Sequence, residues 1–346
     1  MIDAYVELHA RSAFSFLEGS CIPEDLAGAC ASLDMPAMAL LDRNGVYGSP
    51  RFHMAAKNAG VRAHIGSEIT CTNGRTYPLL AASREGYRNL CRLVTRMKLR
   101  APKGEGAATL EEFAEFSPGL ICLTAYPDER LLDIFGKHAL CAELQRHHNR
   151  EEEAHNQEVI ERARRLGIPL VATNNPAYAV PSQRELLDVF TCIRNKVTLA
   201  TAGRLLERNS ERYVKSAAEM TRLFADLPEA IANTREISER LDFTLGDLGY
   251  EFPRYPVPGQ SSSSLTPLDG CTKTLRRGGG MADPGPLIDR HRISLRRISS
   301  VRSASEKSIR ADVVAPKLVA IFCSSSEIAG VDRRYCPMFI DESKAA

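Results

Sequence analysis

Residues 36–70 read PAMALLDRNGVYGSPRFHMAAKNAGVRAHIGSEIT, and this stretch decides the fold class. The short apolar run at 37–41 predicts a buried strand. Residues 50–59 predict a helix that ends at a glycine, and residues 62–65 predict the strand that follows. A strand, a helix and a further strand in this order are typical of α/β proteins with a parallel sheet.

The alternation of strands and helices continues on both sides of this stretch. Further strands are predicted at 5–9, 77–82, 120–124, 139–144 and 168–172. Further helices are predicted at 23–32, 85–98, 150–166 and 182–194, and two more, at 217–224 and 228–241, follow the last strand. About seven short strands, each followed by a helix, fit a barrel of the TIM type near its lower size limit, although an open sheet fits the same pattern.

The last part of the chain has a different composition. The chain has 346 residues, of which 44% are hydrophobic and 25% charged, as in ordinary globular proteins. Residues 259–310, by contrast, hold runs of serine and glycine and ten Lys or Arg against four Asp or Glu, although the whole chain carries only +2. Few apolar residues recur there at helical or strand spacing, so burial cannot offset the ordering entropy. We therefore expect a barrel at 1–200, a helical annex and linker at 201–258, and an irregular Ser/Arg-rich tail at 259–346.

The spacing of the cysteines and the hydropathy of the chain predict where in the cell the protein is located. The ten cysteines are scattered and form no CxxC pair, which excludes a zinc ribbon and a thioredoxin motif. No window approaches the length of a transmembrane helix, and the start, MIDAYVELHARSAF, lacks the basic region and apolar core of a secretory signal. We expect a cytoplasmic protein with reduced, buried thiols and no membrane partner.

Polar side chains gather where the predicted strands end. Chemistry in α/β barrels lies at the carboxyl ends of the strands, so these positions form the candidate site. They are His9, Glu18, Asp42, Glu68, His147, His148, Asn174 and Asn175. Oxygen and imidazole ligands on one rim are the ligand set of a hydrolytic di- or trinuclear metal site. Each residue could equally be a strand cap or a hydrogen-bonded loop residue, and both interpretations stay open at this point.

Several blocks of the sequence are similar to one known family. They are YVELHARSAFSFLEGS (5–20), residues 36–70, YPLLAASREGYRNLCRLVTRMKL (77–99), ELQRHHNREEEAHNQ (143–157), IPLVATNN (168–175), ELLDVFTCIRNKVTL (185–199) and LFADLPEAIANTREISERLDFTLGDLGYEFPRYPVP (223–258). In this order they resemble the N-terminal PHP domain of bacterial DNA polymerase III alpha subunits of the error-prone, translesion type. The resemblance covers about residues 2–258 and implies a distorted (β/α)7 barrel that precedes a polymerase palm. It also implies roles in DNA replication, translesion synthesis and repair, with DNA, the replication clamp and the remainder of the polymerase subunit as partners.

The metal ligands that the resemblance implies are only partly present. Ligand positions of the family are kept at His9, Glu18, Asp42, Glu68 and His147, and replaced at Arg11, Arg43, Tyr126, Asn175 and Ala177. A guanidinium group is always charged and has no lone pair to donate to a metal. We therefore expect a degenerate site without a tightly bound metal cluster, in which Arg11 and Arg43 form ion pairs with the acids Asp42 and Glu68. The alternative is one divalent ion, zinc or manganese, held by His9, Glu68 and His147.

The family's palm has no counterpart after residue 258. Asp269, Asp283 and Asp289 lie in no context like the family's G-R-G-S-A block and its three magnesium-binding aspartates. We therefore expect polymerisation and its magnesium to belong to the parent polymerase only, and this chain to be a truncated or frameshifted product. The leading hypothesis is a support domain of an error-prone polymerase. The alternatives are a metal-dependent phosphoesterase or 3′–5′ exonuclease, and a protein that binds nucleic acid through its basic tail. Whether the chain is itself an enzyme stays open.

Overall fold

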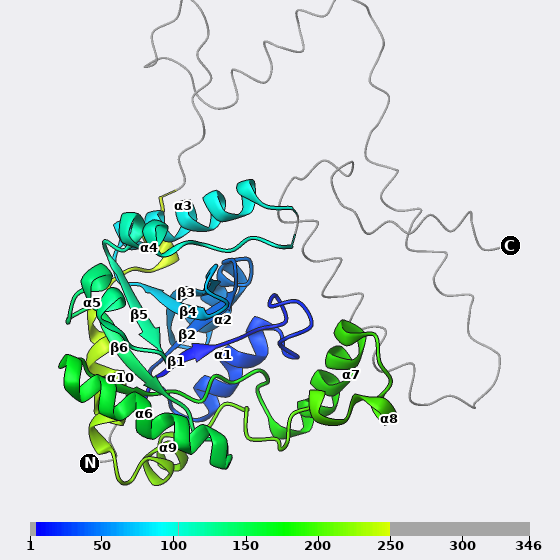
Figure 1. Ribbon diagram of the computed structural model, residues 1–346. Coiled ribbons are helices and arrows are strands. Elements are labelled where there is room, and N and C mark those ends of the chain that lie inside the picture. The colour runs from blue at the N-terminus through cyan, green and yellow to red at the C-terminus, as the bar shows by residue number, and fades with distance from the viewer. Residues whose placement is uncertain (1–4, 103, 250–346) are drawn as a thin grey trace, which may run out of the picture. The chain divides into compact units, whose positions relative to one another are not determined.

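A computed structural model of the chain describes residues 5–102 and 104–249, so the predicted tail at 259–346, with Asp269, Asp283 and Asp289, lies outside the described residues. Seven strands form one sheet in chain order, as Figure 1 shows. They are β1 (Glu7–Ala10), β2 (Ala37–Arg43), β3 (Arg62–Thr70), β4 (Thr76–Ala81), β5 (Leu120–Thr124), β6 (Leu140–Leu144) and β7 (Leu170–Ala172). The predicted α/β class and the seven strands are confirmed.

The sheet is mixed, which corrects the prediction of a parallel sheet. β1, β2 and β3 pair in parallel, as do β5, β6 and β7, but β4 runs antiparallel to both of its neighbours. Residues 71–75 alone join β3 to β4, with Gly74 at a φ of 81°. So short a connection makes a hairpin, because a parallel crossover needs about a dozen residues or more. The prediction that a helix follows every strand is therefore wrong after β3.

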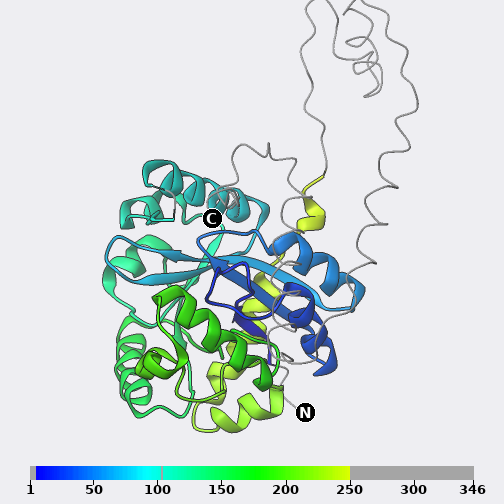
Figure 2. The same cartoon turned by 90° about the vertical axis from the view of Figure 1, so that its right-hand side faces the viewer.

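Most helices of the described chain cover the outer side of the curled sheet, whereas those within 184–202 lie to one side of it (Figures 1 and 2). They are α1 (Pro23–Ser32), α2 (Ser49–Asn58), α3 (Arg84–Arg100), α4 (Leu110–Phe116), α5 (Glu129–Phe135), α6 (Arg150–Leu166), α7 (Arg184–Asn195), α8 (Leu199–Ala202), α9 (Ala217–Leu223) and α10 (Pro228–Arg240). Short 3₁₀ turns lie at Pro181–Gln183, Gly203–Leu205 and Leu245–Asp247. Helix α4 was not predicted, although its capping box between Thr109 and Glu112 is a signal that the sequence carries. None of the described helices is long and apolar enough to cross a membrane.

Helix α10 joins the two edges of the sheet. In the described part of the chain no ladder pairs β7 with β1, so the barrel does not close through its strands. Instead Asn233 donates a hydrogen bond to the Leu170 carbonyl of β7 (2.8 Å), and the Val6 amide beside β1 donates one to Thr234 Oγ1 (3.2 Å). Ile237 of the same helix is buried against the inner face of the sheet. The helix predicted as part of an annex thus completes the barrel wall.

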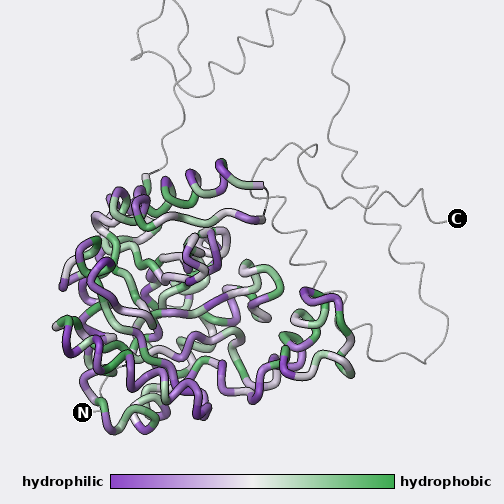
Figure 3. Tube along the Cα trace, viewed as in Figure 1, coloured by the Kyte–Doolittle hydropathy of each residue, from purple (hydrophilic) through white to green (hydrophobic). Residues whose placement is uncertain are grey.

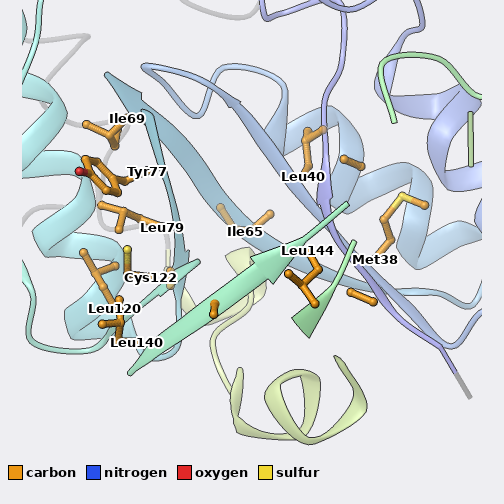
Figure 4. Packing of buried hydrophobic residues seen from close by; sticks show 14 of the residues in the cluster. Met38, Leu40, Ile65, Ile69, Tyr77, Leu79, Leu120, Cys122, Leu140 and Leu144 are labelled. Carbon is orange, nitrogen blue, oxygen red and sulfur yellow. The ribbon is translucent and has the colours of Figure 1, made fainter. Parts of the chain in front are cut away.

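Both faces of the sheet are buried, which explains the continuous apolar runs of its strands. Alternate residues of β2–β6 point to the outer core, including Leu40, Ile65 and Leu79, as Figure 4 shows. The residues between them, such as Leu41, line a smaller inner core. Because α3, α4 and α6 pack on the outside, the loops at the carboxyl ends of β1, β2 and β6 are left free to build the site.

Candidate functional site

Three of the predicted site residues lie at one end of the sheet. Asp42 is in β2, Glu68 is in β3, and Glu18 is in the loop that follows β1. Glu68 was expected just after a strand ending at 65, but β3 continues to Thr70 and places Glu68 opposite Arg43 in the β2–β3 register. The sequence missed this extension because Gly66 looks like a strand end. Here the Leu79 carbonyl lies 2.3 Å from where a Cβ would be, so the strand itself requires glycine.

The two arginines of this site bridge its two glutamates. Arg11 contacts Glu68, and its Nη1 lies 3.6 Å from Glu18 Oε2. Arg43 spans the same two carboxylates, with Nε 2.6 Å from Glu18 Oε2 and Nη2 3.1 Å from Glu68 Oε1. Arg194 of α7, which the sequence did not single out, adds a third guanidinium 3.0 Å from Glu18 Oε1. Each glutamate therefore faces more than one cation.

Glu68 is the more deeply buried of these two glutamates. Burial favours its neutral form, but Arg11, His9 and Arg43 hold the pKa of its carboxyl well below the usual range. Its side chain is only 4% exposed, as against 19% for Glu18. Glu68 is thus a carboxylate held in place by cations rather than a free metal ligand.

His9 faces two carboxylates. Its Nδ1 lies 2.7 Å from Glu143 Oε1 and its Nε2 lies 3.5 Å from Glu68 Oε2. Burial disfavours the charged ring, yet Glu143 and Glu68 raise the pKa of His9 to about 9. The two carboxylates therefore favour the protonated ring, which would have to give up a proton before it could bind a metal.

Glu143 was not predicted as a site residue. It lies in β6, is buried, and also accepts a hydrogen bond from Thr173 Oγ1 (2.5 Å). Burial opposes its charge, but His9 and Thr173 lower the pKa of its carboxyl. A glutamate inside the apolar run ALCAEL was the available signal, because an unpaired acid is almost never buried. We call His9, Arg11, Glu18, Arg43, Glu68, Glu143 and Arg194 the rim cluster.

Asp42 forms a different set of contacts from the one predicted. Its carboxylate accepts hydrogen bonds from the Ser12 amide, the Ser12 hydroxyl and the Ser15 hydroxyl, each at 2.9 Å. Burial raises the pKa of this carboxyl in spite of the three donors. Among the described residues no arginine forms an ion pair with Asp42, so the structure does not show the expected pairing with Asp42 and shows only that with Glu68. Gly48 leaves room for this carboxylate, because a Cβ at that position would lie only 2.5 Å from Asp42 Oδ2.

His147 does not join His9 and Glu68. Its Nδ1 lies 2.7 Å from Glu152 Oε1 and its Nε2 lies 2.9 Å from the Asn174 carbonyl. Within 5–102 and 104–249, no three His, Cys, Asp or Glu side chains are arranged to hold a metal ion. His147 therefore does not complete a three-ligand site with His9 and Glu68 in the described structure.

The three replaced ligand positions other than Arg11 and Arg43 lie in separate environments. The Tyr126 ring lies 4.9 Å from the His155 ring, tilted by 45°, and the Arg75 guanidinium lies 4.4 Å from the centre of the Tyr126 ring. The Asn175 carbonyl accepts hydrogen bonds from Arg212. Ala177 is fully buried, and both its backbone groups are bonded. None of the three contacts the rim cluster through a side chain in the described structure.

A buried polar chain connects the site to the later part of the fold. Glu7 accepts hydrogen bonds from the Tyr5 hydroxyl (2.7 Å), the His9 amide (2.8 Å) and the Asn174 amide (2.9 Å). Asn174 Oδ1 in turn accepts one from Lys215 Nζ (3.1 Å). Burial raises the pKa of Glu7 and lowers that of Lys215. These residues lack any motif, and only the fold brings them together.

Comparison with known proteins agrees with this architecture. Residues 7–169 match the PHP domain family. The chain is 38% identical over 275 residues to an error-prone DNA polymerase of Anaeromyxobacter dehalogenans, covering 73% of this chain and 24% of the relative. It is 34% identical over 287 residues to error-prone DNA polymerase 1 of Rhizobium meliloti, covering 79% and 25%. A suggested metal-dependent phosphoesterase of known structure from Bifidobacterium adolescentis aligns with 49% of this chain and 86% of its own, at 13% identity and a TM-score of 0.38.

The chain spans about a quarter of the length of the curated relatives it matches. The matched part includes every strand of the sheet except β7. Residues 7–169 are therefore a PHP domain, and the chain is a relative of the bacterial error-prone DNA polymerases.

Proposed function

We propose that this PHP domain is a support domain of an error-prone polymerase and that its rim cluster is a structural ion-pair network in place of a metal centre. The remainder of a polymerase subunit, DNA and the replication clamp are the partners proposed, in the cytoplasm. We propose polymerisation with magnesium only for a full-length polymerase, because this chain spans about a quarter of the length of its relatives.

One observation carries the proposal. Arg11 and Arg43 both span Glu18 and Glu68, so the charges of four side chains compensate one another where a metal-binding PHP site needs lone pairs. Arg11 is 7% exposed, and such a cation is stable inside a protein only when it is paired. A divalent ion beside it would meet repulsion from two guanidinium groups and an imidazolium.

Metal analysis tests this proposal. The purified chain is incubated with zinc or manganese, desalted and measured by mass spectrometry, and we expect well under one equivalent. Two or more equivalents of either metal would refute the proposal. The double variant Arg11→His, Arg43→His gives the positive control, because it restores imidazole donors beside Glu68. The variant Arg162→His, Arg164→His adds two histidines on the exposed side of α6 and controls for adventitious binding.

The second candidate is a metal-dependent phosphoesterase or 3′–5′ exonuclease. Hydrolysis of bis(p-nitrophenyl) phosphate with added manganese separates it from the first. We expect no hydrolysis above that of the Glu68→Gln variant, which removes a retained ligand position. Manganese-dependent turnover that is lost in this variant would favour the enzyme.

A further inference from the structure

A long groove runs along the outer side of α3. It has a volume of about 1470 Å³, and its lining includes residues from every turn of this 17-residue helix, together with Phe116 and Leu248. At 1.5 Å per residue the helix is roughly 25 Å long. Figure 1 shows α3 lying across one side of the domain, and Figure 3 shows hydrophilic and hydrophobic residues alternating along it. The groove is separate from the rim cluster, with which it shares no residue.

Two parallel stripes form this surface. Arginines recur at every fourth position along the helix: Arg84, Arg88, Arg92, Arg96 and Arg100. A second set with the same spacing consists of Tyr87, Cys91, Thr95 and Leu99. Residues four apart lie one above another on a helix, so each set is a continuous ridge. The Thr95 hydroxyl donates to the Cys91 carbonyl, which leaves the methyl group to the second ridge, and Leu99 is 83% exposed. An exposed leucine at the end of an apolar ridge is typical of an interaction surface.

The basic ridge is only partly compensated. Arg96 and Arg100 pair with Glu115 and Glu112 of α4. In the first half of α3, Arg88 has one exposed pair with Glu85 at 3.4 Å, and within the described residues Arg84 and Arg92 have no ion pair. Like charges four residues apart destabilise a helix. An acidic partner at this half of the groove would relieve that repulsion.

We propose that this groove binds an acidic amphipathic helix of a partner protein. The apolar stripe of that helix packs on Tyr87, Cys91 and Leu99, and acidic residues along its flank pair with Arg84, Arg88 and Arg92. Both ridges repeat at helical spacing, which matches a second helix. Nucleic acid fits less well, because its phosphates would pair with the arginines but leave the apolar ridge in water.

The test uses the full chain and two synthetic helical peptides of about 18 residues, the length that matches α3. Both carry a leucine stripe, flanked by glutamates in one peptide and by lysines in the other. Binding is followed by fluorescence anisotropy. The variant Arg84→Glu, Arg88→Glu, Arg92→Glu should weaken binding of the glutamate peptide about tenfold, because three exposed ion pairs are lost, and should bind the lysine peptide more tightly than the wild type does. Leu99→Glu should weaken both peptides.

A matched control reverses three exposed arginines elsewhere, Arg162, Arg164 and Arg222, and should leave the affinity unchanged. Thermal unfolding by circular dichroism confirms that each variant is folded. Equal affinity of the wild type for both peptides, or no change in the triple variant, overturns the proposal. Binding of a fluorescent oligo-dT strand that the triple variant loses would assign the surface to nucleic acid instead. Self-association abolished by Leu99→Glu would assign it to a second copy of the chain.

Discussion

The substitution Glu68→Gln removes the carboxylate that holds the rim cluster together. It leaves Arg11 with only the longer contact to Glu18, at 3.6 Å, and takes a negative charge away from His9. Arg43 is affected less, because it keeps Glu18 at 2.6 Å and is 29% exposed to screening solvent. Breaking a buried ion pair by removing one partner costs about 3–5 kcal/mol. Since Glu18 remains, we expect a loss near the lower end, about 3 kcal/mol in the free energy of unfolding.

Urea unfolding followed by circular dichroism measures this loss. The control is Glu115→Gln, whose partner Arg96 is exposed at the surface, and a change of at most about 1 kcal/mol is expected there. Adding Arg11→Met to Glu68→Gln removes the unpaired guanidinium, so the double variant should recover at least about 1 kcal/mol over the sum of the single effects. A loss below about 1 kcal/mol for Glu68→Gln, or strict additivity with Arg11→Met, would refute the view that the cluster is a coupled network.

Three further predictions concern pH and packing. The pKa of His9 is raised to about 9, so its contribution to stability is complete below its ordinary pKa of about 6.5 and is lost as pH rises towards 9. The free energy of unfolding should therefore fall by up to about 3 kcal/mol over that range. In chemical unfolding curves, His9→Gln should flatten this pH dependence. Gly86→Ala should destabilise the fold by several kcal/mol, roughly as overpacking does, because the new Cβ would meet the Gly119 carbonyl, whereas Gly28→Ala in open space should be neutral or slightly stabilising in thermal unfolding. Phe113→Ala, which removes an edge-to-face contact with Tyr77 at 5.4 Å, should lower the free energy of unfolding by about 3–5 kcal/mol in urea titrations, and an effect under 1 kcal/mol would contradict the assigned core.

Prediction from the sequence succeeded where the signal was local. The strands at 37–41 and 120–124 were found because both are apolar runs bounded by turns. The direction of β4 was missed, since a five-residue hairpin and a loop look alike until strand pairing is known. The extension of β3 past Gly66 was missed for a similar reason, because the need for glycine comes from the neighbouring strand.

Only part of the candidate site could be predicted from the sequence. Their positions in the sequence singled out His9, Glu68, Arg11 and Arg43 as candidates. The structure shows the expected ion pairs of Arg11 and Arg43 with Glu68. Glu143 and Arg194 were not predicted, because each joins the cluster from an element more than 130 residues away from β1 in the chain. Contacts over such distances depend on how strands and helices pack, and no local pattern encodes them.

The sequence by itself determined the α/β alternation, the family resemblance, and the presence of Arg11 and Arg43 at positions where that resemblance implies histidine. These follow from residue type and spacing, which act over a few residues. Only the tertiary structure decided that Asp42 is held by serines, that His147 faces Glu152, and that Glu68 and Glu143 raise the pKa of His9. The physical reason is that the charge state of a buried group depends on which carboxylates and cations the fold brings within a few ångströms, and on how much water it removes.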